Sequence, residues 1–160
     1  MTTNADNAGE AARDRGTPLE NAPDPGLGNE PVAKERYTDA EFMRQEWEHI
    51  WTKVWLVGCL ERDLDEPGAY CATEIGPESI LLIRQDDGSV RAFFNVCQHR
   101  GNRLRDRGLG HATTFKCAYH HWEYKLDGSF ENIPDLETFP QGAPCKGLEE
   151  IPCDVWNGWV

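Results

Sequence analysis

The sequence predicts a mainly β domain of antiparallel strands that is preceded by a single helix. Two Asp-Gly pairs, Asp87-Gly88 and Asp127-Gly128, each stand between stretches of β-forming residues and indicate two tight hairpins. Apolar residues at helical spacing occur just before the first of these stretches. The chain has 160 residues, of which 39% are hydrophobic, and this allows one domain with a modest core.

The first 36 residues are expected to be a disordered tail, and the folded domain is expected to span residues 37–160. Gly, Pro, Asn and acidic residues dominate the tail, whereas large apolar side chains are rare in it. A segment of this kind cannot bury enough surface to offset the entropy that is lost when it becomes ordered.

A helix is predicted over residues 39–51. Thr38 and Glu41 have the spacing of a capping box, in which the Thr hydroxyl accepts a hydrogen bond from the backbone N–H of Glu41. The apolar residues that follow recur at helical spacing: Met43, Trp47, Ile50 and Trp51. We expect this apolar stripe to pack against the domain.

Strands are predicted where short runs of Val, Ile, Leu and aromatic residues follow the helix. Each Asp-Gly pair joins two consecutive runs into a hairpin. The predicted strands span residues 54–57, 70–75, 80–83, 90–96, 122–126, 129–132 and 156–160.

The charge balance bears on the possible partners. The chain has 16 Lys and Arg against 28 Asp and Glu, which gives a net charge of −12. Neither a nucleic acid nor an anionic membrane surface is expected as a partner, because the chain offers little positive charge to neutralise phosphates. The sequence contains no apolar run near the roughly 20 residues that cross a bilayer, and no signal-peptide core. We therefore expect a cytoplasmic protein.

Six cysteines in a chain without an export signal are expected to be reduced thiols rather than disulfides. Cysteines and histidines that stand close together are then candidate metal ligands. The four cysteines that lack such a neighbour are interpreted as small buried apolar residues. They are Cys59, Cys71, Cys145 and Cys153.

Two short segments each combine a cysteine with a histidine. One residue separates Cys97 from His99, and two residues separate Cys117 from His120. A thiolate and an imidazole from each of two loops can converge on a metal centre. These four residues can complete a tetrahedral zinc site, but structural zinc usually draws paired cysteines from one loop. An iron pair with both thiolates on one iron and both imidazoles on the other suits the pattern better.

The two segments also resemble a known motif. Residues 97–101 read Cys-Gln-His-Arg-Gly, and residues 117–124 read Cys-Ala-Tyr-His-His-Trp-Glu-Tyr, with Leu-Asp-Gly at 126–128. They closely resemble the Rieske [2Fe–2S] motif in the large (alpha) subunits of bacterial aromatic-ring-hydroxylating oxygenases. The resemblance covers about residues 37–160. Ala118 and His121 depart from it, because the family commonly has Pro and Gly at these two positions, and neither is a ligand position.

The resemblance implies an antiparallel β-sandwich of the Rieske type, with a two-loop cluster-binding subdomain and one N-terminal helix. It also implies a [2Fe–2S] cluster in which Cys97 and Cys117 ligate one iron and His99 and His120 ligate the other. Respiratory-chain Rieske proteins carry an additional, disulfide-bonded cysteine in each loop. Neither segment of this chain has one, so the motif resembles the oxygenase type.

Four further residues of the motif are candidates for roles around the cluster. Arg100 and Trp122 carry N–H donors that can reach its sulfur atoms, although Trp122 is equally well interpreted as an aromatic lid. Gly101 is expected to permit a tight turn. Tyr119 is either a donor to sulfur or a core aromatic residue.

A run of four arginines follows the first pair of ligands: Arg100, Arg103, Arg105 and Arg107. These residues either form a docking face for an acidic electron donor or lie on a solvated loop with intramolecular ion pairs.

The resemblance implies an electron-transfer module of an oxygenase that catabolises aromatic hydrocarbons, with a ferredoxin or reductase as its donor. The oxygen-activating site of that family is a mononuclear Fe(II) held by two histidines and a carboxylate, and no match to it occurs in this sequence. No catalytic residue is therefore assigned, and the catalytic domain is expected beyond residue 160, in a homo-oligomer or an alpha/beta hetero-oligomer. The alternatives are a stand-alone Rieske-type ferredoxin and, less favoured, a structural zinc module that mediates protein interactions.

Overall fold

The computed structural model describes residues 26, 28, 30–142, 144 and 146–160. The chain divides into two compact units, Met1–Met43 and Arg44–Val160, which are described separately. Most of the predicted tail lies outside the described residues, and the short helix α1 (Glu35–Thr38) begins in its last part. Among the helices that the structure describes, none is both long and apolar enough to cross a lipid bilayer.

The predicted helix is present as α2 (Ala40–His49) and is followed by a short 3₁₀ turn, η1 (Trp51–Lys53). Its first turn is capped by Asp39, whose Oδ1 accepts hydrogen bonds from the N–H groups of Glu41 (2.8 Å) and Phe42 (3.4 Å). The prediction that Thr38 caps the helix is wrong by one residue. Because Thr38 ends α1, its hydroxyl donates back to the carbonyl of Lys34.

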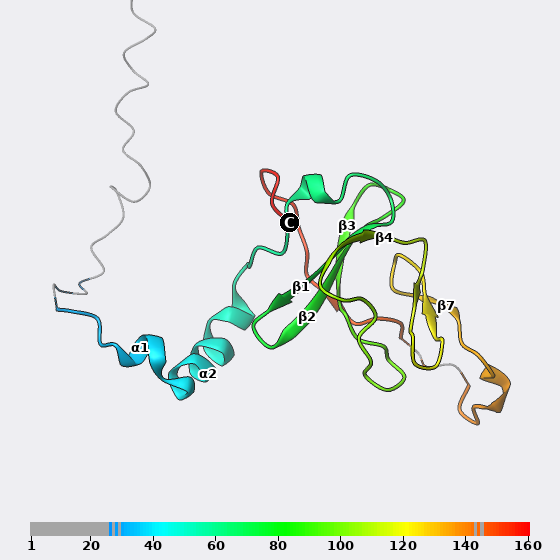
Figure 1. Cartoon of the computed structure of the whole chain (residues 1–160), viewed down its shortest axis with the longest axis horizontal. Helices are drawn as coiled ribbons and strands as arrows, with labels where there is room; N and C mark the ends of the chain where they lie inside the picture. Colours follow the sequence, from blue (N-terminus) through cyan, green and yellow to red (C-terminus); the bar gives the residue numbers. More distant parts are fainter. Residues whose placement is uncertain (1–25, 27, 29, 143, 145) are drawn as a thin grey trace, which may run out of the picture. The chain divides into compact units, whose positions relative to one another are not determined.

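In the described part of the chain, eight strands form two antiparallel sheets, which confirms the predicted mainly β fold class (Figure 1). The five-stranded sheet has the order β4-β1-β2-β3-β8, and the three-stranded sheet has the order β5-β6-β7. The strands of the first sheet are β1 (Ala69–Ile75), β2 (Glu78–Arg84), β3 (Val90–Phe94), β4 (Gly108–His111) and β8 (Glu150–Ile151). Those of the second are β5 (Phe115–Lys116), β6 (Glu123–Tyr124) and β7 (Phe130–Asn132). Two further 3₁₀ turns are η2 (Glu61–Asp63) and η3 (Leu136–Thr138).

Both predicted Asp-Gly hairpins are present, between β2 and β3 and between β6 and β7. The predicted strands at 54–57 and 156–160 are not formed. Val54, Trp55 and Val57 are exposed and lie outside every strand of the described structure. The chain turns back at Asn157 and Gly158, both with positive φ, so residues 156–160 make isolated bridges only.

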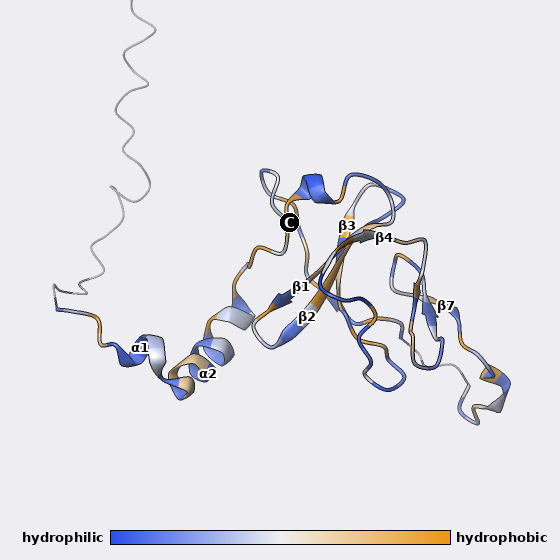
Figure 2. Cartoon of the chain, viewed as in Figure 1, coloured by the Kyte–Doolittle hydropathy of each residue, from blue (hydrophilic) through white to orange (hydrophobic). Residues whose placement is uncertain are grey.

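The five-stranded sheet has an apolar core on each face, which explains why β2 is almost continuously apolar (Figure 2). On one face, Leu81, Ile83 and Phe93 pack with the residues that surround both predicted ligand segments. On the other face, Ile80 and Leu82 pack with Leu64, Ala92 and Val160. The first of these cores therefore connects the sheet to the candidate site.

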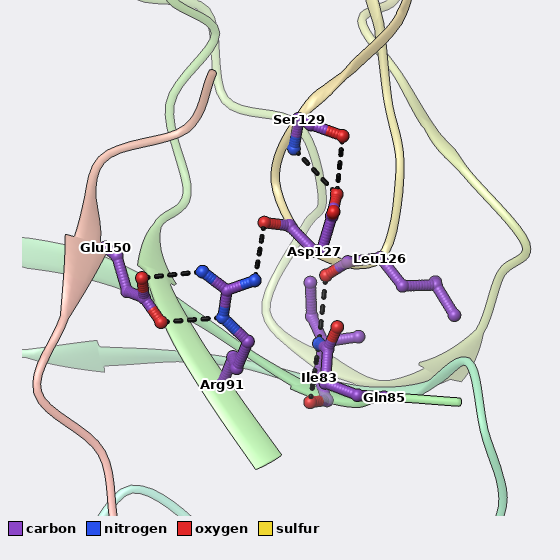
Figure 3. A network of polar contacts seen from close by, with 7 residues as sticks. All are labelled: Ile83, Gln85, Arg91, Leu126, Asp127, Ser129 and Glu150. Atoms are coloured by element: carbon purple, nitrogen blue, oxygen red, sulfur yellow. Dashed lines mark hydrogen bonds and ion pairs between the residues drawn. The ribbon is translucent and has the colours of Figure 1, made fainter. Parts of the chain in front are cut away.

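Polar contacts tie the second hairpin turn to the larger sheet (Figure 3). The amide of Gln85, which is 6% exposed, donates to the carbonyl of Leu126 (2.9 Å). Arg91 donates to both carboxylate oxygens of Glu150, at 2.6 Å each, and also to the carbonyl of Asp127 (3.0 Å). The contacts of Gln85 with Leu126 and of Arg91 with Asp127 hold the turn between β6 and β7 against the large sheet.

The two hairpin turns allow a matched test of packing at this junction. Gly88 and Gly128 have nearly the same φ, +83° and +80°, but a Cβ at Gly88 meets nothing within 4 Å, whereas one at Gly128 lies 2.6 Å from the ring of Phe93. We expect Gly88→Ala to lower the free energy of unfolding by about 1 kcal/mol, because of backbone strain. Gly128→Ala should lower it by ~1–3 kcal/mol more than Gly88→Ala does, because the added methyl group also overpacks against Phe93. The free energy of unfolding of both variants checks this, and equal losses would contradict it.

Candidate metal centre

The first ligand-bearing loop, residues 97–102, follows strand β3 and closes on itself. The N–H of Cys97 donates to the carbonyl of Asn102 (2.8 Å), and the N–H of Gly101 donates to the carbonyl of Cys97 (2.9 Å). Gly101 has a φ of +70°, a left-handed conformation that glycine adopts at little cost. It lies at the tight turn of the loop.

The second ligand-bearing loop, residues 117–122, repeats this closure. The N–H of Cys117 donates to the carbonyl of Trp122 (2.8 Å), and the N–H of His121 donates to the carbonyl of Cys117 (3.1 Å). His121 has a φ of +60°, so a residue with a Cβ takes the place that glycine has in the first loop. The two cysteines therefore occupy equivalent positions in two loops of the same geometry.

The structure brings the four predicted ligands together as two pairs. The rings of His99 and His120 lie edge to face, with their centroids 4.5 Å apart. Cys97 and Cys117 are almost fully buried, with exposed fractions of 2% and 1%, and each thiol influences the ionisation of the other.

The surroundings of the two thiols differ. Burial opposes the ionisation of Cys117, but hydrogen bonds from the backbone of Tyr119 and His120, together with the side chains of Cys97 and Asn102, outweigh it. The pKa of Cys117 therefore lies below its ordinary value. Burial dominates at Cys97 and raises its pKa. Partial desolvation, followed by the neighbouring His99 and Arg100, lowers the pKa of His120, which favours the neutral imidazole that binds metals.

The donor set fits a two-iron cluster. The Nδ1 atom of His99 is buried and has no hydrogen-bond partner among the described residues. A buried polar atom without a partner destabilises the fold by about 1–3 kcal/mol, and coordination of a metal ion by Nδ1 would relieve this cost. Nowhere in the described part of the chain do three or more Cys, His, Asp or Glu side chains gather as they would around a single ion. The two thiols and two imidazoles have the composition of the Rieske ligand set.

Tyr124 is a site residue that the sequence analysis did not identify. It is fully buried in β6, and its hydroxyl lies 3.2 Å from the Sγ of Cys97 and accepts a hydrogen bond from the N–H of Gln98 (2.9 Å). Burial, reinforced by Cys97, raises the pKa of Tyr124, so the hydroxyl keeps its proton and can donate it to the sulfur. Tyr124 lies seven residues after Cys117, just beyond the second loop, but its hydroxyl contacts Cys97 and Gln98 of the first loop. Sequence spacing gives no signal for this contact.

Two aromatic residues cover the imidazoles. Trp122 is 3% exposed, and its ring stacks on His99 with centroids 4.7 Å apart, which is the position of an aromatic lid. Tyr119 is 59% exposed, and its ring lies against His120 at 3.7 Å, so it is not in the core. Arg100 is exposed on the same loop as His99.

The four arginines of the basic run do not share one surface role. Arg103 forms an ion pair with Glu74 (2.9 Å), and Arg105 is half-buried and donates to backbone carbonyls. Arg100 and Arg107 are exposed. The contacts of Arg103 and Arg105 favour the intramolecular interpretation for these two residues.

Three of the remaining cysteines pack in the apolar core on the other face of the sheet. Cys71 is buried there, and Cys59 and Cys153 are half-buried beside it. Cys145 lies outside the described residues.

The left-handed conformation of His121 leads to a stability prediction. A residue with a Cβ at this φ destabilises the folded state by about 1–2 kcal/mol, and glycine at this position would remove that strain. Part of this gain is lost because glycine has more conformational entropy in the unfolded chain. We expect His121→Gly to raise the midpoint of thermal unfolding by about 2–4 °C, equivalent to ~1 kcal/mol. The control is Ala118→Gly in the same loop, where φ is not positive and the midpoint should fall. A less stable His121→Gly protein would contradict this account of the loop.

Comparison with known proteins is consistent with this geometry. A family model of the Rieske [2Fe-2S] domain matches residues 54–150. The large oxygenase component of the 2,4-dinitrotoluene dioxygenase system of Burkholderia sp. (strain RASC) is 36% identical over 128 residues, which are 78% of this chain and 28% of that protein. The alpha subunit of chlorobenzene dioxygenase of Cupriavidus sp. (strain PS12) is 37% identical over 105 residues, which are 65% of this chain and 23% of that protein.

Solved structures show the same relationship. A naphthalene 1,2-dioxygenase mutant bound to phenanthrene superposes with a TM-score of 0.71 at 31% identity, over 76% of this chain and 28% of that one. The apo form of the quaternary ammonium Rieske monooxygenase CntA superposes with a TM-score of 0.75 at 30% identity, over 81% of this chain and 38% of that one. The chain thus belongs to the Rieske [2Fe–2S] domain family and matches the Rieske part of ring-hydroxylating oxygenase alpha subunits.

Proposed function

We propose that the chain is the electron-transfer module of a ring-hydroxylating oxygenase. In this proposal Cys97 and Cys117 hold one iron of a [2Fe–2S] cluster, and His99 and His120 hold the other. The observation that carries the proposal is that the two loops present two buried thiols and two adjacent imidazoles, one of which has a buried Nδ1 with no partner among the described residues. When bound, such a cluster supplies a one-electron carrier with a potential of roughly −150 to +300 mV.

The choice of ligands determines how readily the site takes up an electron. Two thiolates contribute two negative charges, which balance the net charge of +2 on two ferric ions and two sulfides. Four thiolates would leave the same site with a charge of −2, which disfavours a further electron and fits the lower potential of about −400 mV in plant-type ferredoxins. The imidazoles, which are half-buried, also keep ring N–H groups that can donate to a partner or release a proton.

The activity of the whole protein is a further part of the proposal, because the chain spans 28% and 23% of the two curated relatives described above. We propose a ferredoxin or reductase as the electron donor and a mononuclear Fe(II) in a separate catalytic domain as the acceptor. We also propose an aromatic ring as the substrate, and a cytoplasmic homo-oligomer or alpha/beta hetero-oligomer as the assembly. Relatives named for 2,4-dinitrotoluene and chlorobenzene support an aromatic substrate, although the relative CntA is named for quaternary ammonium compounds.

Anaerobic loading of the full 160-residue chain with iron and sulfide tests the proposed site. We expect two irons and two sulfides per chain, and a rhombic EPR signal after reduction with an average g below that of an all-thiolate cluster. His99→Ala and His120→Ala should abolish this signal. The matched control is His111→Ala, because His111 is exposed and contacts the carbonyl of Pro67 instead. A colourless protein with one zinc per chain would contradict the proposal and support the zinc module.

Tyr124 provides a second test, which concerns the potential rather than the binding of the cluster. A hydrogen bond to a charged sulfur contributes about 1.5–3 kcal/mol, and it stabilises the reduced state more because reduction adds negative charge. We expect Tyr124→Phe to lower the midpoint potential by roughly 60 mV, the shift for a tenfold change in a one-electron equilibrium. Tyr70→Phe is the control, because the Tyr70 ring packs on Phe115 rather than on a ligand. An unchanged potential in Tyr124→Phe would show that the hydroxyl does not tune the site.

A further inference from the structure

Arg105 lies in the segment between the two ligand-bearing loops, and its side chain is engaged inside the domain. The residue is half-buried, and its guanidinium lies over the ring of Phe115, 4.9 Å from the centroid, and 5.8 Å from the centroid of Tyr70. Cation–π contacts of this kind stabilise a partly desolvated arginine.

The guanidinium joins the chain just after the first loop to the chain just before the second. Its Nη1 donates to the carbonyl of Leu104 (2.8 Å) and, at 3.4 Å, to that of Lys116, while its Nη2 donates to the carbonyl of Thr114 (3.1 Å). Lys116 directly precedes Cys117 in the sequence, and Leu104 follows the first loop by two residues. One side chain therefore bridges the attachment points of both loops.

The backbone of Arg105 is also held by hydrogen bonds, in this case to Asn95, which precedes the first loop. Asn95, which is 2% exposed, donates to the carbonyl of Arg105 (2.7 Å) and accepts from its N–H (3.1 Å). Asn95 is itself anchored to strand β2, because its side chain donates to the hydroxyl of Ser79 (3.1 Å) and its N–H donates to the Ser79 carbonyl (2.8 Å). The arginine is thus connected to the large sheet, to the first loop and to the second.

We propose that Arg105 is a positioning residue that holds the two ligand-bearing loops at the separation the cluster requires. This inference rests on the proposed function, since it concerns the same four ligands. A planar guanidinium can donate to several carbonyls in fixed directions, and a lysine ammonium at the same place cannot reproduce that pattern. Arg103, two residues earlier, serves as the matched control, because among the described residues its side chain contacts only the exposed Glu74.

The test compares Arg105→Met, Arg105→Lys and Arg103→Met as full-length, iron-loaded proteins. Two measurements are made on each: the first-order rate of iron loss to a chelator, and the spread of g values in the reduced EPR spectrum. We expect Arg105→Met to lose iron about tenfold faster than the wild type, since it forfeits several charged hydrogen bonds, and to show a broadened g spread. Arg105→Lys should be intermediate, and Arg103→Met should stay within about twofold of the wild type.

Each outcome has a defined meaning. A chelation rate and an EPR spectrum like those of the wild type in Arg105→Met would overturn the proposal, even if the melting temperature fell, because Arg105 would then stabilise the fold without positioning the ligands. If Arg105→Met does not fold, Arg105→Lys decides the question, and wild-type behaviour there overturns the proposal. An unmodified chain that binds no iron would overturn the proposed function as well, and this failure is recognisable because it needs no variant.

Discussion

The candidate site depends on a backbone constraint that both ligand-bearing loops obey. Each loop is closed by two hydrogen bonds between its cysteine and the residues four and five positions later, and the residue at the fourth position has a positive φ. This closure places Cys97 and Cys117 at equivalent positions, although each is followed by its histidine at a different distance. Glycine meets the requirement in the first loop, whereas His121 meets it in the second at the expense of strain. The loops stay in place because the core residues Leu81, Ile83 and Phe93 support them from the large sheet.

Once the loops are closed, the surroundings of three of the four donors favour metal binding, whereas burial raises the pKa of the fourth, Cys97. Backbone N–H groups lower the pKa of Cys117, partial desolvation lowers that of His120, and the Nδ1 of His99 is buried without a partner among the described residues. Tyr124 adds a hydrogen bond to Cys97. Polar contacts outside the site, from Gln85 and Arg91 to the second hairpin turn, hold the small sheet that carries Tyr124. The packing of the small sheet thus determines where Tyr124 lies, and the position of Tyr124 determines the hydrogen bond to the sulfur of Cys97.

Sequence patterns were sufficient where a local signal exists. The Asp-Gly turns predicted both hairpins, helical spacing predicted α2, and the Cys/His pairs identified side chains that the fold brings together. The patterns failed where tertiary contacts decide: β4, β5 and β8 have two to four residues and carry no periodicity, and the apolar run at 54–57 forms no strand. The roles of Tyr124 and Arg105 arise from contacts between distant segments, which spacing along the chain does not encode.

In the proposed cluster the two irons have different ligands, sulfur on one and imidazole on the other. Mössbauer spectroscopy of the oxidised chain loaded with ⁵⁷Fe distinguishes them, because each iron gives a signal that depends on its own coordination. We expect two quadrupole doublets of equal area with distinct isomer shifts. A single doublet, which would indicate two equivalent irons, would contradict the proposal.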